Sequence, residues 1–506
     1  MREFLRRVRC YPTPRFLAMT ACWLRLRKMR LSFLSRATVI ALRLLIFVSC
    51  AGCATFHPQP LSSSQITSAF EARTLHNPEL KAFLGANLHQ ECVPWPPQSW
   101  DLTTLTLVAL YYHPDLDVAR ATADVAEAGV VTARGRPNPS IEIAPGYASN
   151  SAPGITPWLL HSPFDIPIET AGKRGYRITQ ATHLSEAARF TITTTAWQVR
   201  SRVRKRLLDV YAATQTEALL HSQQAVREEI VTLMEQRLAA GEISRPELTL
   251  VRLALEQTRL AVHDVQKQRA EARAQLAEAL GLPVDALAGA VLNFEAFEHL
   301  PAALPTHEGW RQALLNRPDL LAALAEYAAS ESALQLEIAK QYPDFHLNPN
   351  YERDTEENKW FLGLSLELPV LDRNEGPIAE AEARRQETAA RVRSLQAGIL
   401  GEIDRARAGY ETAQQKLATA DAFLSAHARQ QQSLRALLTA GEADRLDFLA
   451  AQLEFDVSAR ARLDALVTAQ QSFGLFEDAI QRPLSPPGPV LVTPEVRPPA
   501  REEHTQ

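Results

Sequence analysis

Two stretches of this chain are far longer than the helices of ordinary globular domains. Residues 177–240 contain neither proline nor glycine, and residues 378–440 contain no proline. A continuous helix of about 64 residues is roughly 95 Å long, because each residue adds 1.5 Å. A shorter helical pattern follows each stretch, at about residues 246–280 and 445–481. The sequence therefore predicts two long helical hairpins.

The two hairpins belong to two copies of one unit. The segment HPDLDVA, which starts at His113, is matched by RPDLLAA, which starts at Arg317. Further landmarks recur in the same order and at nearly the same separation: Pro139 and Pro343, Tyr147 and Tyr351, Pro167 and Pro369, Gly241 and Gly441. Such a repeat indicates an internal duplication, in which each copy folds into the same set of elements.

Each copy is predicted to begin with a helix and to continue with a β-hairpin. In FLGLSLELP, which starts at Phe361, leucine alternates with other residues, as in a half-buried strand. Strands of about ten residues have the length of membrane-barrel strands, although a soluble edge hairpin is the alternative. The predicted bounds are: first copy 101–300, with a helix at 102–134, a β-hairpin at about 139–169 and a helical hairpin at about 172–281; second copy 301–483, with corresponding elements at 310–340, about 343–369 and about 376–481.

The returning helix of the first copy carries a coiled-coil pattern. Leu248, Leu255, Val262 and Leu276 fall on one heptad position, and Val251, Thr258, Val265, Ala272 and Ala279 fall on another. Apolar residues at these two positions form the seam along which paired helices pack. Arg269 is the one residue of the seam that does not fit.

The N-terminus has the pattern of a signal peptide. Residues 1–52 carry eleven Lys and Arg but a single acidic residue, and an apolar run precedes CAGC at residues 50–53. Met29, or Met19, is the expected true start. The ending resembles a bacterial lipobox, so residues 53–100 are expected to be a segment anchored through acylated Cys53. Cys50 is a weaker candidate, and a plain secretory signal is the alternative. The Pro-rich residues 484–506 are expected to be disordered.

Composition excludes several functions. Outside the leader, 43 basic residues stand against 57 acidic ones, a balance that argues against nucleic-acid binding. Removal of the leader and acylation of Cys53 leave Cys92 as the single free thiol, so no disulfide or cysteine-based metal site is expected. Catalytic motifs are absent, and the thirteen histidines are scattered without the spacing of metal ligands. We expect neither an enzyme nor a bound metal or other cofactor.

Five stretches resemble the TolC-type outer-membrane efflux protein family. They are WDLTTLTLVALYYHPDL from Trp100, IETAGKRGYRITQA from Ile168, LPVLDRNEG from Leu368, AAGEISRPEL from Ala239 and TAGEADRLDF from Thr439. The resemblance covers about residues 61–483. It implies an α+β membrane protein that forms a homotrimer. A 12-stranded outer-membrane β-barrel, with four strands from each chain, would continue into a long periplasmic α-helical coiled-coil tunnel.

The AGKR and DRNEG turns are similar to those of the heavy-metal (CzcC/CusC-like) branch, which serves RND pumps. The implied function is a passive outer-membrane channel, lipid-anchored and extending into the periplasm. Its implied partners are outer-membrane lipid, a periplasmic adaptor (membrane fusion protein) and an inner-membrane RND pump. Heavy-metal cations are the favoured substrates, and drugs or organic compounds are the alternative. A periplasmic adaptor or a coiled-coil scaffold without a pore is the competing class.

Two sets of residues are candidate sites. In the family the helical turns are the periplasmic tip, where the tunnel is constricted. The candidate gate residues there are Gly241, Glu242, Arg245, Glu247, Gly441, Glu442, Arg445 and Asp447. Glu247 and Asp447 would form acidic rings, and the other four charged residues would form salt links that hold the tip shut. A solvated helix–helix turn is the structural alternative. The second set would lie where strand becomes helix, and consists of Gly172, Lys173, Arg174, Arg373 and Gly376.

Overall fold

A computed structural model describes residues 56–89, 93–151, 154–300, 311 and 314–484. The predicted leader, Cys53, Cys92 and most of the Pro-rich tail lie outside these ranges. The chain divides into two compact units, Met1–Thr67 and Ser68–Gln506. The first described helix is α3, Ser63–Glu71, and all the features discussed below lie in the second unit.

The first helix of each copy is interrupted just before a proline. Instead of one helix at 102–134, the structure has α5, Leu102–Tyr112, and α6, Pro114–Arg134. Proline disfavours the α conformation of the preceding residue, and His113 is accordingly extended. In the second copy, α11 covers Pro318–Ala339 and also begins on a proline. The predicted start of that helix at residue 310 lies outside the described ranges.

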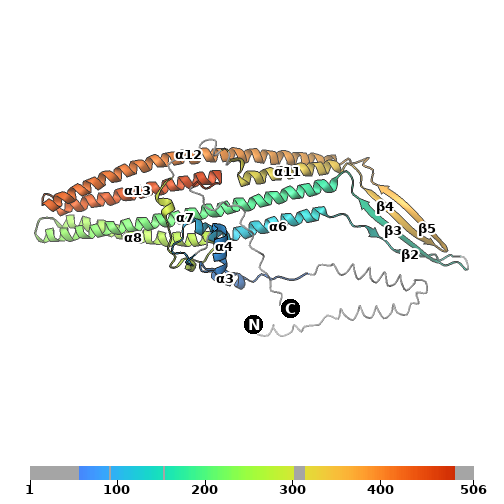
Figure 1. The fold of residues 1–506 in the computed structure, drawn as a ribbon, viewed down its shortest axis with the longest axis horizontal. Coiled ribbons are helices and arrows are strands. Elements are labelled where there is room, and N and C mark those ends of the chain that lie inside the picture. The colour runs from blue at the N-terminus through green and yellow to red at the C-terminus, as the bar shows by residue number, and fades with distance from the viewer. Residues whose placement is uncertain (1–55, 90–92, 152–153, 301–310, 312–313, 485–506) are drawn as a thin grey trace, which may run out of the picture. The chain divides into compact units, whose positions relative to one another are not determined.

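Four helices form the two predicted hairpins and lie side by side (Figure 1). The long helices are α7, Lys173–Ala239, and α12, Glu375–Ala440, with 67 and 66 residues. The returning helices are α8, Arg245–Leu280, and α13, Arg445–Ile480. Helix α7 also packs against α13, which joins the first hairpin to the second. The long hairpins inferred from the sequence are thus confirmed.

The heptad pattern of α8 corresponds to its buried face. Eight of its nine predicted seam residues are buried, and Val251 is half-buried. Arg269, the misfit, is 45% exposed and its Nη1 lies 2.6 Å from Glu217 Oε2 of α7, whose side chain is 10% exposed. A nearly buried carboxylate needs a cationic partner, which explains an arginine at the border of an apolar seam.

The strands form one antiparallel sheet with the order β1/β2, β3, β4, β5. Strands β1, Ser140–Ile141, and β2, Ala144–Tyr147, both pair with β3, Trp158–Ile168. Strands β4, Phe345–Asp354, and β5, Glu357–Leu366, pair along their full length, with a short turn between Asp354 and Glu357. The polar side chains at this end of the hairpin alternate between both faces of the sheet: Arg353 and Asn358 share the face of Tyr351, whereas Glu352 lies on the other face. The central pair, β3 and β4, joins the two copies.

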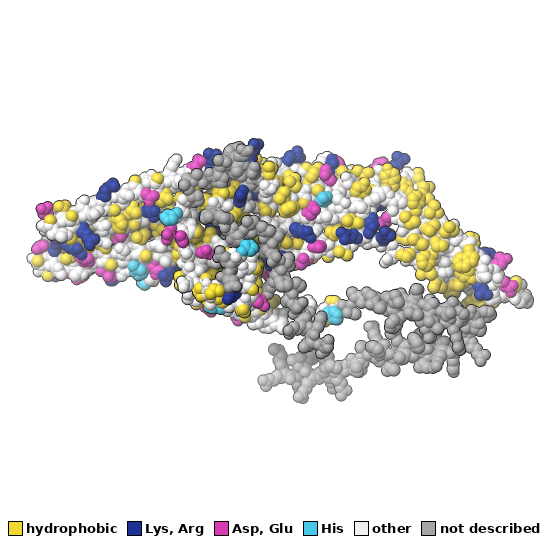
Figure 2. All heavy atoms as spheres, in the orientation of Figure 1, with side chains coloured by type: hydrophobic (Ala, Val, Ile, Leu, Met, Phe, Trp, Pro, Cys, Tyr) yellow, Lys and Arg dark blue, Asp and Glu magenta, His cyan; other side chains and the backbone are white. Residues whose placement is uncertain are grey.

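The sheet has one apolar and one polar face. Its exposed hydrophobic side chains appear at the strand end of the second unit in Figure 2. Alternation along the paired strands places the following residues on the apolar face: Trp158, Leu160, Phe164, Ile166, Phe345, Leu347, Tyr351, Trp360, Leu362, Leu364 and Leu366. On the opposite face, His346 Nδ1 lies 2.9 Å from Asp165, which also accepts a hydrogen bond from Asn348. The apolar face is solvent-exposed in the single chain.

A hydrophobic core lies at mid-length of the helices. Helix α4, Pro78–Leu88, packs on α5, and the connector after α8 contains η1, Val284–Leu287, and α9, Glu295–Glu298. Buried residues of these elements form one cluster with α7, α8 and α13. None of the helices that the structure describes is long and apolar enough to cross a bilayer.

Candidate functional site

The strand-to-helix turn of the first copy ties together the ends of three elements. Gly172 adopts a left-handed conformation, with φ of 74°, immediately before α7. Lys173 Nζ donates to the carbonyl oxygen of Tyr342 at 2.7 Å and contacts Asp344 Oδ1 at 2.8 Å. Arg174 donates two hydrogen bonds to the carbonyl oxygen of Arg134, at the end of α6. These side chains satisfy carbonyl groups that helix ends leave free, which is a structural role.

The corresponding turn of the second copy uses different residues. Asn374, rather than a glycine, is left-handed, with φ of 62°, and its side chain donates to the carbonyl oxygen of Glu337. Gly376 lies inside α12, and a Cβ there would meet no atom within 4 Å. The left-handed residue of this turn is therefore Asn374, because asparagine also tolerates that region, and Gly376 is the second residue of the helix that follows. Arg373 contributes its carbonyl oxygen, which accepts from Gln341.

Both tips reverse the chain with the same backbone geometry. Gly241 and Gly441 have φ of 80° and 78°. In each tip the next residue, Glu242 or Glu442, donates its N–H to a carbonyl oxygen five residues earlier at 2.9 Å. This is the Schellman ending of a helix, which requires a left-handed residue and so favours glycine. The repeated glycine is thus explained by the turn.

The residues that follow the two glycines differ in their contacts. The carboxylate of Glu247 accepts the N–H of Ser244 at 3.0 Å, half of a capping box at the start of α8. Asp447 occupies the equivalent position of α13 and is exposed. Within the described part of the chain, Asp447 forms no ion pair or side-chain hydrogen bond. Of the two predicted ring carboxylates, one is therefore engaged in its own helix cap and the other is free.

Two ion pairs connect the tips of the two hairpins. Arg237, near the end of α7, pairs with Asp444, the N-cap of α13. Arg445 Nη2 lies 2.6 Å from Glu229 Oε1 of α7. Arg445 was predicted to be a salt-link residue, but its partner was not identified. The other three predicted members, Glu242, Glu442 and Arg245, form no ion pair among the described residues.

A small apolar cluster supports these ion pairs. Val226 of α7 packs with Phe448 and Leu449 of α13, and the half-buried leucines of α12 border them. The Arg237 guanidinium lowers the pKa of Asp444 by hydrogen bonding and by its charge. Asp444 thus remains ionised to lower pH than an ordinary aspartate, and the pair persists at neutral pH.

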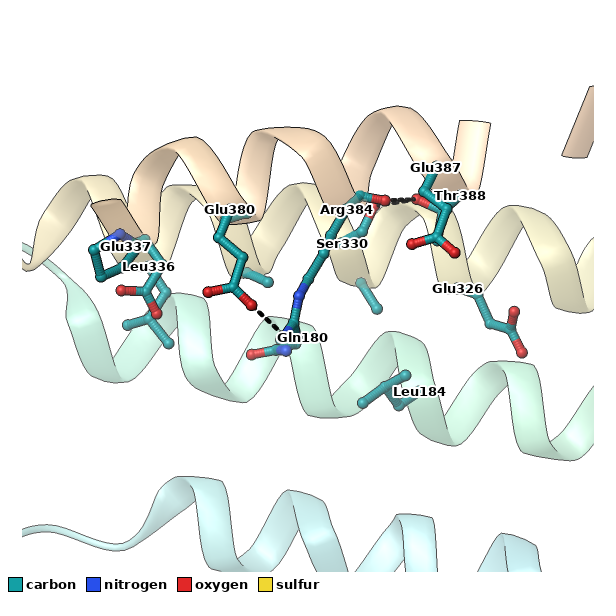
Figure 3. A pocket seen from close by; sticks show the side chains of 14 residues that line it. Gln180, Leu184, Glu326, Ser330, Leu336, Glu337, Glu380, Arg384, Glu387 and Thr388 are labelled. Carbon is teal, nitrogen blue, oxygen red and sulfur yellow. Dashed lines mark hydrogen bonds and ion pairs between the residues drawn. The ribbon is translucent and has the colours of Figure 1, made fainter. Parts of the chain in front are cut away.

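A groove at the opposite end of the helices is the second candidate. It lies between α7, α11 and α12 and has a volume of about 770 Å³ (Figure 3). Its lining includes Glu326, Glu337 and Glu387, together with Glu380, which pairs with Arg384. Glu337 and Glu387 pair with Lys340 and Arg391, and the lining holds no set of catalytic groups. The groove therefore does not define a reaction.

The structure adds residues that the sequence did not indicate. Arg237 and Glu229 are the tip residues concerned, and no motif marks them, since their partners come from the other copy. Asp444 lies within TAGEADRLDF, but its ion pair with Arg237 was not predicted. Within the described ranges, no three His, Cys, Asp or Glu side chains come together as metal ligands would. The candidate site is thus a contact between two helical hairpins.

Paired hairpins of this length, continuous with an antiparallel sheet that is apolar on one face, define a class of envelope protein. The family model described as outer membrane efflux protein matches residues 107–282 and 310–473, one match in each copy. The chain belongs to this family and is a protein of the outer membrane, from which the helices extend into the periplasm.

Individual proteins resemble the chain to different extents. The cobalt-zinc-cadmium resistance protein CzcC of Cupriavidus metallidurans is 28% identical over 269 residues, which are 53% of this chain and 62% of that protein. The match therefore spans less than two thirds of this relative's length. The solved structure of VceC from Vibrio cholerae has a TM-score of 0.61 at 19% identity and covers 75% of this chain and 95% of VceC. The solved structure of the CmeC channel of Campylobacter jejuni has a TM-score of 0.62 at 16% identity, and the match covers 86% of this chain and 96% of CmeC. These structures establish a TolC-like fold.

Proposed function

We propose that this chain is the outer-membrane channel of a tripartite RND-type efflux system. It acts as a passive conduit rather than an enzyme, and a periplasmic adaptor and an inner-membrane pump supply contact and energy. The observation that carries this proposal is the contact between the tips of the two helical hairpins. Within a fold shared with outer-membrane channels, the tips are fastened by exposed ion pairs and a small apolar cluster, contacts that can be opened.

The sheet supports a trimer. Strand β5 and the β1/β2 pair are its two edges, and one of its faces is apolar. Unpaired strand edges are not tolerated in lipid, because their backbone groups would lack hydrogen-bond partners. If β1 and β2 count as one interrupted strand, three copies supply twelve strands and join every edge to another. Outer-membrane fractionation with crosslinking tests this, and a soluble monomer or an inner-membrane location, as expected of an adaptor or scaffold, would refute it.

We infer that Asp447 is the main acidic residue of the gate. Its carboxylate is free, whereas that of Glu247 is held by the Ser244 N–H. Three copies around one axis would attract cations and disfavour anions. Asp447→Ala is expected to raise single-channel conductance or to weaken block by cations in planar bilayers. Glu247→Ala is the matched control and is expected to change conductance less. Unchanged conductance and block in Asp447→Ala would remove this residue from the gate.

Metal cations are the substrates that we favour over organic compounds. The support is the similarity to the cobalt-zinc-cadmium resistance protein. A deletion strain should become sensitive to cobalt, zinc or cadmium salts and recover when the gene is returned. Sensitivity to detergents and dyes alone, with unchanged metal tolerance, would assign the channel to organic export.

A lipid anchor on Cys53 is part of the same proposal. Mass spectrometry of the mature N-terminus should find an acylated Cys53, and Cys53→Ser should abolish the modification. An acyl group on Cys50 would show that Cys50 is the anchored residue. A cleaved and unmodified N-terminus would show that the leader is a plain secretory signal.

A further inference from the structure

A second contact between α7 and α13 is made by buried charges. Glu477 of α13 is 1% exposed. Its Oε2 lies 3.4 Å from Nη1 of Arg200 and 3.5 Å from Nε of Arg204, both on α7. One carboxylate thus neutralises part of the charge of two buried guanidinium groups. A buried charge persists only with such partners, so this contact fixes the two helices to each other.

The surroundings of Arg204 leave it little freedom. Its Nη1 donates to the carbonyl oxygen of Gln470 at 2.9 Å, and its Nη2 donates to Gln470 Oε1 at 3.0 Å. The rings of Phe297 and Phe473 lie 5.6 Å and 5.4 Å from its Cζ. A Cβ on Gly474 would lie 2.3 Å from Nη1, so glycine provides the space for the guanidinium.

Neighbouring polar groups extend the contact between α7 and α13. Asp478 Oδ2 lies 2.5 Å from Ser201 Oγ, and its Oδ1 accepts from Trp197 Nε1 at 3.0 Å. Gln470 Nε2 donates to the carbonyl oxygens of Phe297 and His299 at 3.0 Å, which attaches the connector between the copies. We refer to Arg200, Arg204, Gln470, Glu477 and Asp478 as the ion cluster.

The ion cluster and the tip lie at opposite ends of α13. Glu477 follows Asp444 by 33 residues, which corresponds to roughly 50 Å of helix. Exposed pairs such as Arg237 with Asp444 contribute little to stability, whereas separating the partners of a buried pair leaves uncompensated charges in the protein interior. A force that separates the hairpins therefore breaks the tip contacts and leaves the ion cluster closed.

We propose that the ion cluster is the fixed point about which the α12–α13 hairpin turns relative to α7 when the tips separate. The proposal rests on the proposed function, because it takes the tips as the moving gate. A turn of about 10° over roughly 50 Å moves the tip by about 9 Å. Contacts between the two ends, such as the 3.1 Å hydrogen bond from Ser222 to Asp456, would open progressively along the interface.

Two crosslinks distinguish a fixed point from a moving one. In the full-length protein with Glu229→Ala, which weakens the tip, and Cys92→Ser, one variant carries Ser201→Cys with Asp478→Cys. The other carries Arg237→Cys with Asp444→Cys. Each pair of cysteines is closed by oxidation or by a short thiol crosslinker and then released by reduction or cleavage. Single-channel conductance in planar bilayers is measured in both states, with the single-cysteine variants as matched controls.

We expect release of the tip crosslink to raise conductance several-fold. Release of the Ser201–Asp478 crosslink should leave conductance unchanged, because those atoms do not separate during opening. A several-fold rise there would overturn the proposal while leaving the gate at the tip intact. Unchanged conductance on release of the tip crosslink would instead refute the gate, and the fixed point with it. Circular dichroism and recovery from outer membranes confirm that each variant is folded.

Discussion

Gly474→Ala tests the packing of the ion cluster with one methyl group. The added Cβ would lie 2.3 Å from Arg204 Nη1, so the guanidinium must move, and we expect it to give up its two hydrogen bonds to Gln470. Hydrogen bonds to charged groups contribute about 1.5–3 kcal/mol each. Alanine recovers about 1 kcal/mol of helix propensity. We expect the free energy of unfolding to fall by about 3 kcal/mol, roughly a 150-fold shift in the equilibrium.

The measurement is urea denaturation of the purified full-length protein, followed by circular dichroism of the helices. Gly409→Ala is the matched control, because the same substitution in α12 meets no atom within 4 Å. It should leave stability unchanged or raise it by up to about 1 kcal/mol. If Gly474→Ala behaves like this control, Arg204 reorients without loss and the ion cluster is not closely packed.

Further predictions concern the tip ion pair, the contact between α7 and α13, and the strand-to-helix turn of the first copy. In a double-mutant cycle, Arg237→Ala and Asp444→Ala should each raise conductance, and the double variant should add little, whereas additive effects would show that the pair does not hold the tip. Because the pKa of Asp444 is lowered, its contribution is complete above about pH 4 and is lost as pH falls further, so conductance should rise on acidification in the wild type but not in Asp444→Asn. Burial raises the pKa of Asp456, so ionisation of this residue lowers the free energy of unfolding as the pH rises above the usual pKa of an aspartate. Asp456→Asn should therefore be more stable than the wild type at pH 7.5, and equal stability of the two proteins would refute this. Lys173→Met should lower thermal stability by about 1–3 kcal/mol by leaving Asp344 without its cation, and Lys173→Arg should be less affected.

The sequence was sufficient for the long helices because few alternatives exist for such stretches. A run without helix breakers and a heptad seam determine α7 and α8, and Gly241 marks the reversal between them. The break before Pro114 follows from the conformational restriction that proline places on His113, although the helical pattern of the sequence continues on both sides of it.

The tip contacts could not be read from the sequence in the same way. Arg237 meets Asp444, and Glu229 meets Arg445, only because α7 and α13 pack in one particular register. Many charged residues on these helices have the same local surroundings, so no spacing rule selects the pairs. The turn at Asn374 was missed for a related reason, since asparagine and Gly376 are both acceptable turn residues until the helix start is known.

The ion cluster also bears on the evolutionary history of the chain. Helices α8 and α13 both have 36 residues and start 200 positions apart, so Gly474 and Glu477 correspond to Ala274 and Ala277. The alanines of α8 cannot reproduce the buried pairing. An ancestor that assembled from single, identical repeats would have had the same residues at every helix–helix joint. Duplication within one gene removed that constraint, and the two descendants of one helix diverged, with the buried pairing present in only one of them.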